Sequence, residues 1–115
     1  MISAKNYSFN TANDGGTGTA YVNMILYDLA ILELTKLPLA VHDSLLFKNI
    51  SDERVVKIFE EYEKSRKQIF VSFDKKNSYG SSELTEIIEN HKVIELFYGG
   101  GELFGRSWAK KETAD

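Results

Sequence analysis

The chain has 115 residues, a formal net charge of −3 from 14 basic and 17 acidic residues, and no cysteine. The length suits one domain, and a composition of 43% hydrophobic and 27% charged residues is that of a soluble globular domain. The acidic balance excludes autonomous nucleic-acid binding through charge, and the lack of cysteine excludes disulfides and thiolate chemistry. With neither a secretory signal nor an uninterrupted apolar span, we expect a cytoplasmic protein that does not contact the membrane.

The first half of the chain is expected to start with a short strand at Tyr7 to Asn10, followed by a glycine-rich loop. A helix from Ala20 to about Leu34 should follow, with Thr17 or Thr19 as its N-cap. The polar residues of this helix are scattered around it rather than gathered on one face. We therefore expect it to be buried on several sides, partly by a second protein surface.

Apolar strands alternate with helices along the rest of the chain, which favours an α/β fold with a mixed or parallel sheet flanked by helices and a short C-terminal hairpin. Residues 1–108 should form this single lobe, and residues 109–115 should form a frayed tail. The expected elements are a buried strand at Leu37 to His42, a loop at Leu45 to Ser51, a helix from Asp52 to about Lys67, a buried strand at Gln68 to Phe73, a helix from about Ser82 to Asn90, a strand from Lys92 to Phe97, and a hairpin at Gly99 to Phe104.

Two features together indicate half of a nucleotide site. Glycines allow close approach of a phosphate, and a helix that opens after them directs unpaired N–H groups at an anion. Asp43, which follows an apolar strand, is placed where Mg²⁺ is commonly held. The loop is neither a P-loop nor a GxGxxG fingerprint, because no GxxxxGK[ST] or GxGxxG sequence occurs.

The order of these segments resembles the C-terminal lobe of ABC-type ATPases of the SMC, RecF and RecN kind. The matching segments are Asp14-Gly-Gly-Thr17 for the signature loop, Leu39-Ala-Val-His-Asp43 for Walker B, the region near Asp52 for the D-loop, and Ile69-Phe-Val-Ser-Phe73 for the switch strand. Over most of its length, including Phe104-Gly-Arg-Ser-Trp108, the chain is also similar to an uncharacterised bacterial family found at the C-terminal end of long coiled-coil ATPases.

The resemblance implies ATP and Mg²⁺ as cofactors of a complete protein, with Asp43 holding the metal. It implies three partners: an N-terminal Walker A lobe of the same protein, a second copy in a homodimer, and DNA bound by the full-length protein. The isolated chain is expected to bind no cofactor and to hydrolyse no ATP. The phosphate-contacting residues would be Asn13, Asp14, Gly15, Gly16, Thr17 and Gly18.

Three positions depart from the family pattern. Asp14 replaces the signature serine, Ser44 replaces the glutamate that orients the attacking water, and Phe73 stands at the switch histidine position. His42 could partly substitute as a catalytic group, although strand alternation should point it away from Asp43.

The resemblance implies a half-site lobe of an SMC/RecN-like ATP-binding protein acting in DNA repair, maintenance or defence. The alternative is a non-catalytic interaction module that docks through the apolar helix 20–34. A free-standing small-molecule enzyme is the weakest interpretation, because no activated nucleophile or acid–base pair has a recognisable spacing.

Overall fold

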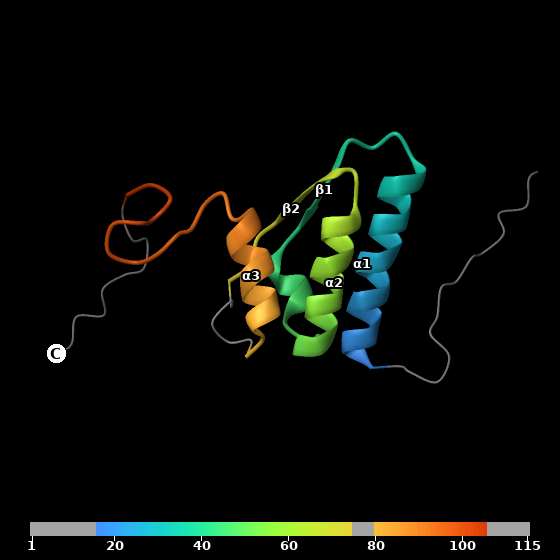
Figure 1. Ribbon diagram of the computed structural model, residues 1–115, viewed down its shortest axis with the longest axis horizontal. Helices are drawn as coiled ribbons and strands as arrows, with labels where there is room; N and C mark the ends of the chain where they lie inside the picture. The colour runs from blue at the N-terminus through green and yellow to red at the C-terminus, as the bar shows by residue number, and fades with distance from the viewer. Residues whose placement is uncertain (1–15, 75–79, 106–115) are drawn as a thin grey trace, which may run out of the picture.

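The computed structural model describes residues 16–74 and 80–105, and the helices in this part stand side by side against a two-stranded sheet (Figure 1). The elements in chain order are α1 (Thr17–Leu34), β1 (Leu39–His42), the 3₁₀ helix η1 (Ser44–Phe47), α2 (Asp52–Lys64), β2 (Gln68–Val71) and α3 (Ser82–His91). The helices run in one direction and the strands in the other. The helix N-termini lie at the lower end of the molecule in Figure 1, whereas the carboxyl end of β1 lies beside the second half of α1, where His42 contacts Asp28.

The sheet is parallel, one of the two arrangements (mixed or parallel) that the sequence predicted. Helix α2 forms the crossover between its strands. Leu39 pairs with Gln68 and His42 pairs with Val71, so the strands have equal length and no offset. Side chains alternate across the sheet: Ala40, His42, Ile69 and Val71 face the helices, and Leu39, Val41, Gln68 and Phe70 are exposed on the other face. The described helices thus cover one face of the sheet and leave the other bare.

The core lies between the helices and the inner face of the sheet. The predicted inward face of α2 is confirmed: Val55, Ile58 and Phe59 are buried, and Tyr62 packs against them. The predicted inward face of α3 is also confirmed, since Leu84 is buried and Ile87 and Ile88 pack on the core. The buried residues that pack together in one cluster are Ile25, Leu29, Phe47, Ile50, Val55, Val56, Ile58, Phe59 and Leu84.

Helix α1 begins earlier than the sequence predicted, at Thr17 rather than Ala20. The expected threonine N-cap is wrong: Gly16 is the N-cap, and its carbonyl accepts the first helical hydrogen bond from the N–H of Ala20 at 3.2 Å. Gly18 can start the helix this close to the body because it lacks a side chain. A Cβ at Gly18 would stand 2.4 Å from the carbonyl oxygen of Asn49.

The described residues of this chain bury helix α1 on one side, and its burial by a second protein surface stays a prediction. Ile25, Leu29 and Leu32 face the body, whereas Tyr27 and Leu34 are exposed. The expected second surface on α1 is not supplied by any described residue of this chain.

The segment from Leu45 to Ser51, predicted as a loop, contains most of η1 and carries core side chains. Phe47 and Ile50 are buried, and the N–H of Ile50 donates to the carbonyl of Phe47 at 3.2 Å. The sequence prediction missed this turn because a single turn of 3₁₀ helix is too short to show periodicity.

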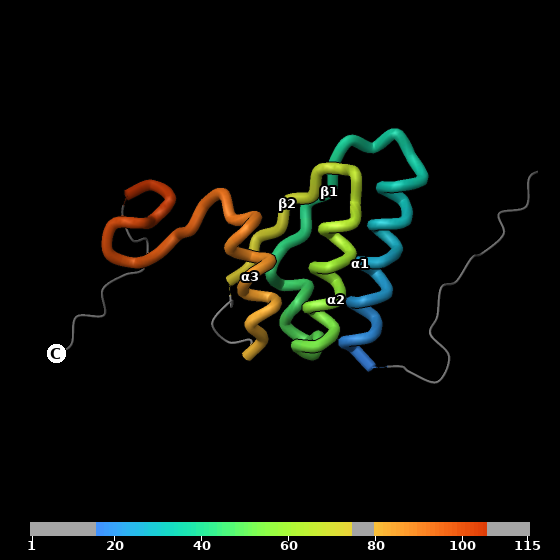
Figure 2. Tube along the Cα trace, viewed as in Figure 1, coloured from blue at the N-terminus to red at the C-terminus, as the bar shows by residue number. Residues whose placement is uncertain are grey.

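The predicted strand from Lys92 to Phe97 is wrong for this chain. These residues leave α3 as an exposed extended arm that points away from the helices (Figures 1 and 2). The predicted hairpin is reduced to one antiparallel bridge between Phe97 and Gly101, and the carboxylate of Glu102 accepts hydrogen bonds from the N–H groups of Gly99 and Gly100. The apolar sequence has strand character, but no described strand of this chain lies beside it to pair with.

Among the described residues, no helix is both long and apolar enough to cross a membrane.

Candidate functional site at the strand ends

The carboxyl ends of the two strands bring Asp43 and Ser72 together. Because His42 pairs with Val71, the residues that follow them lie opposite each other, and the N–H of Ser72 donates to the carbonyl of His42 at 3.0 Å. The hydroxyl of Ser72 donates to Oδ1 of Asp43 at 2.6 Å and accepts from the N–H of Ser44 at 3.2 Å. One serine thus orients the carboxylate and fixes the start of η1.

Asp43 is exposed and held in its charged form. Its pKa is lowered, first by the hydrogen bond from Ser72 and then by the N–H of Ser44, with a smaller contribution from the positive charge of Lys48. A hydrogen bond to the charged form favours ionisation. At neutral pH the group is therefore an exposed, oriented carboxylate.

A carboxylate of this kind fits one ligand position of Mg²⁺. That ion is usually held by one or two carboxylates together with waters and substrate phosphates, rather than by an all-protein cage. Within residues 16–74 and 80–105, no group of three or more His, Asp or Glu side chains could hold a metal ion. Asp43 would supply one protein ligand of such an ion.

His42 points to the opposite side of the strand from Asp43, as strand alternation predicted. Its side chain is only 4% exposed and lies among the helices, with Nδ1 2.7 Å from the hydroxyl of Tyr62 and Nε2 3.3 Å from Oδ2 of Asp28. Since a carboxylate only accepts, Nε2 is the donor toward Asp28, and Nδ1 shares a hydrogen bond with the hydroxyl of Tyr62. This network joins β1 to α2 and α1, and it removes His42 from the strand-end group.

Tyr62 keeps its proton in this network. Burial, followed by the charge of Asp28, raises the pKa of Tyr62 far above its ordinary value. The hydroxyl therefore remains available as a donor to His42 across the physiological pH range.

The glycine-rich loop is described only from Gly16 onward, and the predicted phosphate-contacting residues Asn13, Asp14 and Gly15 lie outside the described residues. Thr17 is the first residue of α1, and Gly18 packs against Asn49. The structure thus gives Gly18 a packing role that needs no ligand. The start of α1 is also joined to α2, because Nη1 of Arg54 donates to Oγ1 of Thr19 at 2.8 Å.

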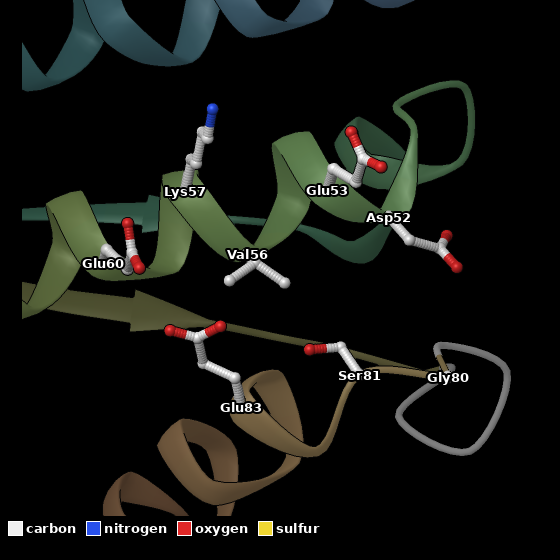
Figure 3. Close-up of a pocket in the computed structure, with 8 residues that line it drawn as sticks. All are labelled: Asp52, Glu53, Val56, Lys57, Glu60, Gly80, Ser81 and Glu83. Atoms are coloured by element: carbon white, nitrogen blue, oxygen red, sulfur yellow. The ribbon is translucent and has the colours of Figure 1, made fainter.

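A groove of about 430 Å³ between α2 and α3 is a separate feature (Figure 3). Glu60 and Glu83 point into it from the two helices, and Asp52 and Glu53 stand at the start of α2. Lys57 is the one basic residue in its lining, and neither Asp43 nor Ser72 contributes to it. Its negative charge opposes a phosphate.

Ser72 and Arg54 are the residues that the sequence interpretation did not single out. Ser72 carried no usable signal, because its position opposite Asp43 depends on the register between the two strands, which the sequence does not state. Arg54 carried none, because its contact with Thr19 joins two helices far apart in the chain.

Comparison with known proteins identifies a family. Residues 2–107 match the model of a family described as an uncharacterised protein conserved in bacteria, DUF2326. The chain belongs to this family. No curated protein and no solved structure matches the chain. The DUF2326 match thus covers all of the described residues, including the strand ends and the exposed arm.

Proposed function

We propose that this DUF2326 chain is the C-terminal lobe of an SMC/RecN-like ATP-binding protein that acts in DNA repair, maintenance or defence. The observation that carries the proposal is the oriented carboxylate of Asp43, held by Ser72 of the neighbouring parallel strand. It directly follows His42, whose ring contacts Asp28 in the second half of α1, so it lies at the end of β1 and not at the start of α1. In open α/β sheets, ligands bind outside the carboxyl ends of the strands, and helix N-termini favour phosphates.

The incomplete sheet supports a second lobe. Parallel sheets are normally covered on both faces, and a two-stranded sheet is marginal by itself. Here Leu39, Val41 and Phe70 form a bare apolar face, and no third strand among the described residues pairs with β1 or β2. An N-terminal Walker A lobe of the same protein would complete the sheet, and the exposed side chains of Val93, Ile94 and Leu96 would supply further apolar surface for it.

The complete protein would bind ATP with Mg²⁺, with Asp43 as a metal ligand and the glycine loop contacting phosphate across a homodimer. Any DNA contact would belong to the full-length protein. This chain lacks the Walker A lysine and glycine cradle, so we expect no hydrolysis from the chain alone.

Hydrolysis by the complete protein should be slow. Ser44 has no carboxylate to orient water, and Phe73 is turned toward the core. The Phe73 ring packs 5.2 Å from the ring of Phe59 and 5.6 Å from that of Phe47, measured between centroids. Neither residue replaces the group that its position carries in the resembling ATPases.

The test is Mg²⁺-dependent ATP binding by the complete protein, compared with an Asp43→Asn variant. Loss of the metal ligand should weaken Mg·ATP binding at least tenfold while leaving metal-free ATP binding unchanged. Glu61→Gln is the matched control, because Glu61 is an exposed carboxylate near the far end of α2 that bonds Lys64 at 2.7 Å. Equal Mg·ATP affinities for Asp43→Asn and the unmodified protein would refute the role of Asp43.

A further inference from the structure

Strand β1 is held against the helices by a polar side chain rather than by apolar packing. Its one buried residue is His42, which is 4% exposed. None of its side chains belongs to the apolar cluster formed by the described residues, whereas β2 packs Ile69 and Val71 against that cluster. The position of β1 relative to the helices therefore depends on the contacts of His42.

Two helices contact the ring of His42 at its two nitrogens. Nε2 lies 3.3 Å from Oδ2 of Asp28 in α1, and Nδ1 lies 2.7 Å from the hydroxyl of Tyr62 in α2. The ring also packs beside that of Tyr62, with 5.6 Å between the centroids. Apolar packing is non-directional, but polar contacts at both nitrogens restrict where the ring can lie and how it is turned. The end of β1 is thus fixed relative to α1 and α2.

The residues of the candidate site are attached directly to this fixed strand end. The carbonyl of His42 accepts from the N–H of Ser72 at 3.0 Å, and the hydroxyl of Ser72 donates to Oδ1 of Asp43 at 2.6 Å. Asp43 is the next residue after His42, and its backbone is extended, with φ −95° and ψ 152°. A shift of His42 would therefore move both the carbonyl that holds Ser72 and the carboxylate that Ser72 orients.

We propose that Asp28 and Tyr62 are positioning residues for Asp43, and that they act through the ring of His42 on the end of β1. Side chains that orient a metal ligand without touching the metal commonly tune the metal affinity of the site. Asp28 is 45% exposed, so its removal loosens this contact without opening a cavity in the core. The positioning is a property of this chain, and its effect on Mg²⁺ rests on the proposed function.

The first test is amide hydrogen exchange in the 115-residue chain. The reporters are the N–H of Ser72, which donates to the carbonyl of His42, and the N–H of Ser44, which donates to the hydroxyl of Ser72. Asp28→Ala should speed exchange of both amides at least fivefold and leave the amides of α3 unchanged, because only the strand ends loosen. Tyr62→Phe should speed the same two amides, so the test does not depend on one variant.

Two control variants separate positioning from charge and from a general loss of stability. An asparagine oxygen can still accept from Nε2 of His42, so Asp28→Asn should keep the slow exchange of both amides. Glu33 is the other acidic residue of α1 and contacts Ser65 rather than β1, so Glu33→Ala should keep it as well. Unchanged exchange in both Asp28→Ala and Tyr62→Phe, or equal acceleration in Glu33→Ala, would overturn the proposal.

The second test is Mg·ATP binding by the complete protein. Asp28→Ala should weaken Mg·ATP binding at least threefold and leave metal-free ATP binding unchanged, whereas Asp28→Asn should leave both unchanged. If Asp43→Asn weakens Mg·ATP binding and Asp28→Ala does not, the positioning of the metal ligand by Asp28 is refuted. If Asp43→Asn itself has no effect, the proposed function fails, and amide exchange alone decides whether Asp28 and Tyr62 position the strand end.

Discussion

Replacing Gly18 with alanine tests how closely α1 approaches the loop before α2. The new Cβ would stand 2.4 Å from the carbonyl oxygen of Asn49, whereas ordinary contacts start at 3.4 Å. The backbone at Asn49 would have to retreat by about 1 Å, and it adjoins Ile50, a core residue only 5% exposed.

The magnitude follows from two opposing effects. Overpacking of this kind costs about 1–3 kcal/mol, and replacing glycine by alanine in a helix returns up to about 1 kcal/mol. We expect Gly18→Ala to lower the free energy of unfolding by about 1–2 kcal/mol, with a fall in Tm of roughly 4–8 °C per kcal/mol. Urea unfolding followed by circular dichroism measures the change.

Gly80→Ala is the matched control, because a Cβ at Gly80 meets nothing within 4 Å. Its free energy of unfolding should stay within about 0.5 kcal/mol of the unmodified chain. If Gly18→Ala proved as stable as Gly80→Ala, the close approach of α1 to Asn49 would be refuted. The glycine at position 18 would then need an explanation other than packing.

Three further variants address other parts of the structure. Ser72→Ala should raise the pKa of Asp43 toward its ordinary value of 3.8, as measured by NMR titration of the carboxyl carbon. Because the fold favours the carboxylate form, the unmodified chain should be more stable than Ser72→Ala above pH 3.8. This difference should disappear as the pH falls through the lowered pKa of Asp43. Tyr62→Phe leaves Nδ1 of the buried His42 without its partner and should cost about 1–3 kcal/mol in chemical denaturation, whereas an unchanged midpoint would contradict the network. Ser81→Ala removes the side chain that accepts the N–H of Leu84 at 3.3 Å, so α3 should lose about 1 kcal/mol, seen as faster amide exchange in its first turn; unchanged exchange would count against this cap.

The fold was predictable where periodicity was strong. Short apolar runs located both strands, although the prediction that they are buried was wrong for their outer face, where Leu39, Val41 and Phe70 are exposed. The 3.6-residue pattern located α2 and α3 with their inward faces. Boundaries were less accurate: α2 ends at Lys64 rather than Lys67, and Lys67 instead donates to the carbonyls of Thr35 and Leu37. Such contacts join residues about 30 positions apart, and local propensity carries no information about them.

The arm shows why the remaining prediction failed. Val93, Ile94 and Leu96 have the composition of a strand, but a strand forms only where another strand supplies hydrogen bonds. The described part of the chain supplies none there, so the segment is exposed. The sequence shows that these residues favour a strand, but the strand forms only where a partner strand lies beside them.

The candidate site was predictable in part. The position of Asp43 after an apolar strand located its carboxylate, and alternation predicted that His42 would face the other way. The role of Ser72 depended on the register between strands 29 residues apart, which the sequence does not state. The roles predicted for Asn13, Asp14 and Gly15 remain predictions.

The most direct measurement of the central claim is to sequence the source DNA upstream of the Met1 codon and read its frame. The account predicts an open frame that encodes a long heptad region preceded by GxxxxGK[ST], the lobe that would complete the sheet and supply the phosphate-binding lysine. An in-frame stop codon followed by a ribosome-binding site would contradict a two-lobed ATP-binding protein encoded as one chain.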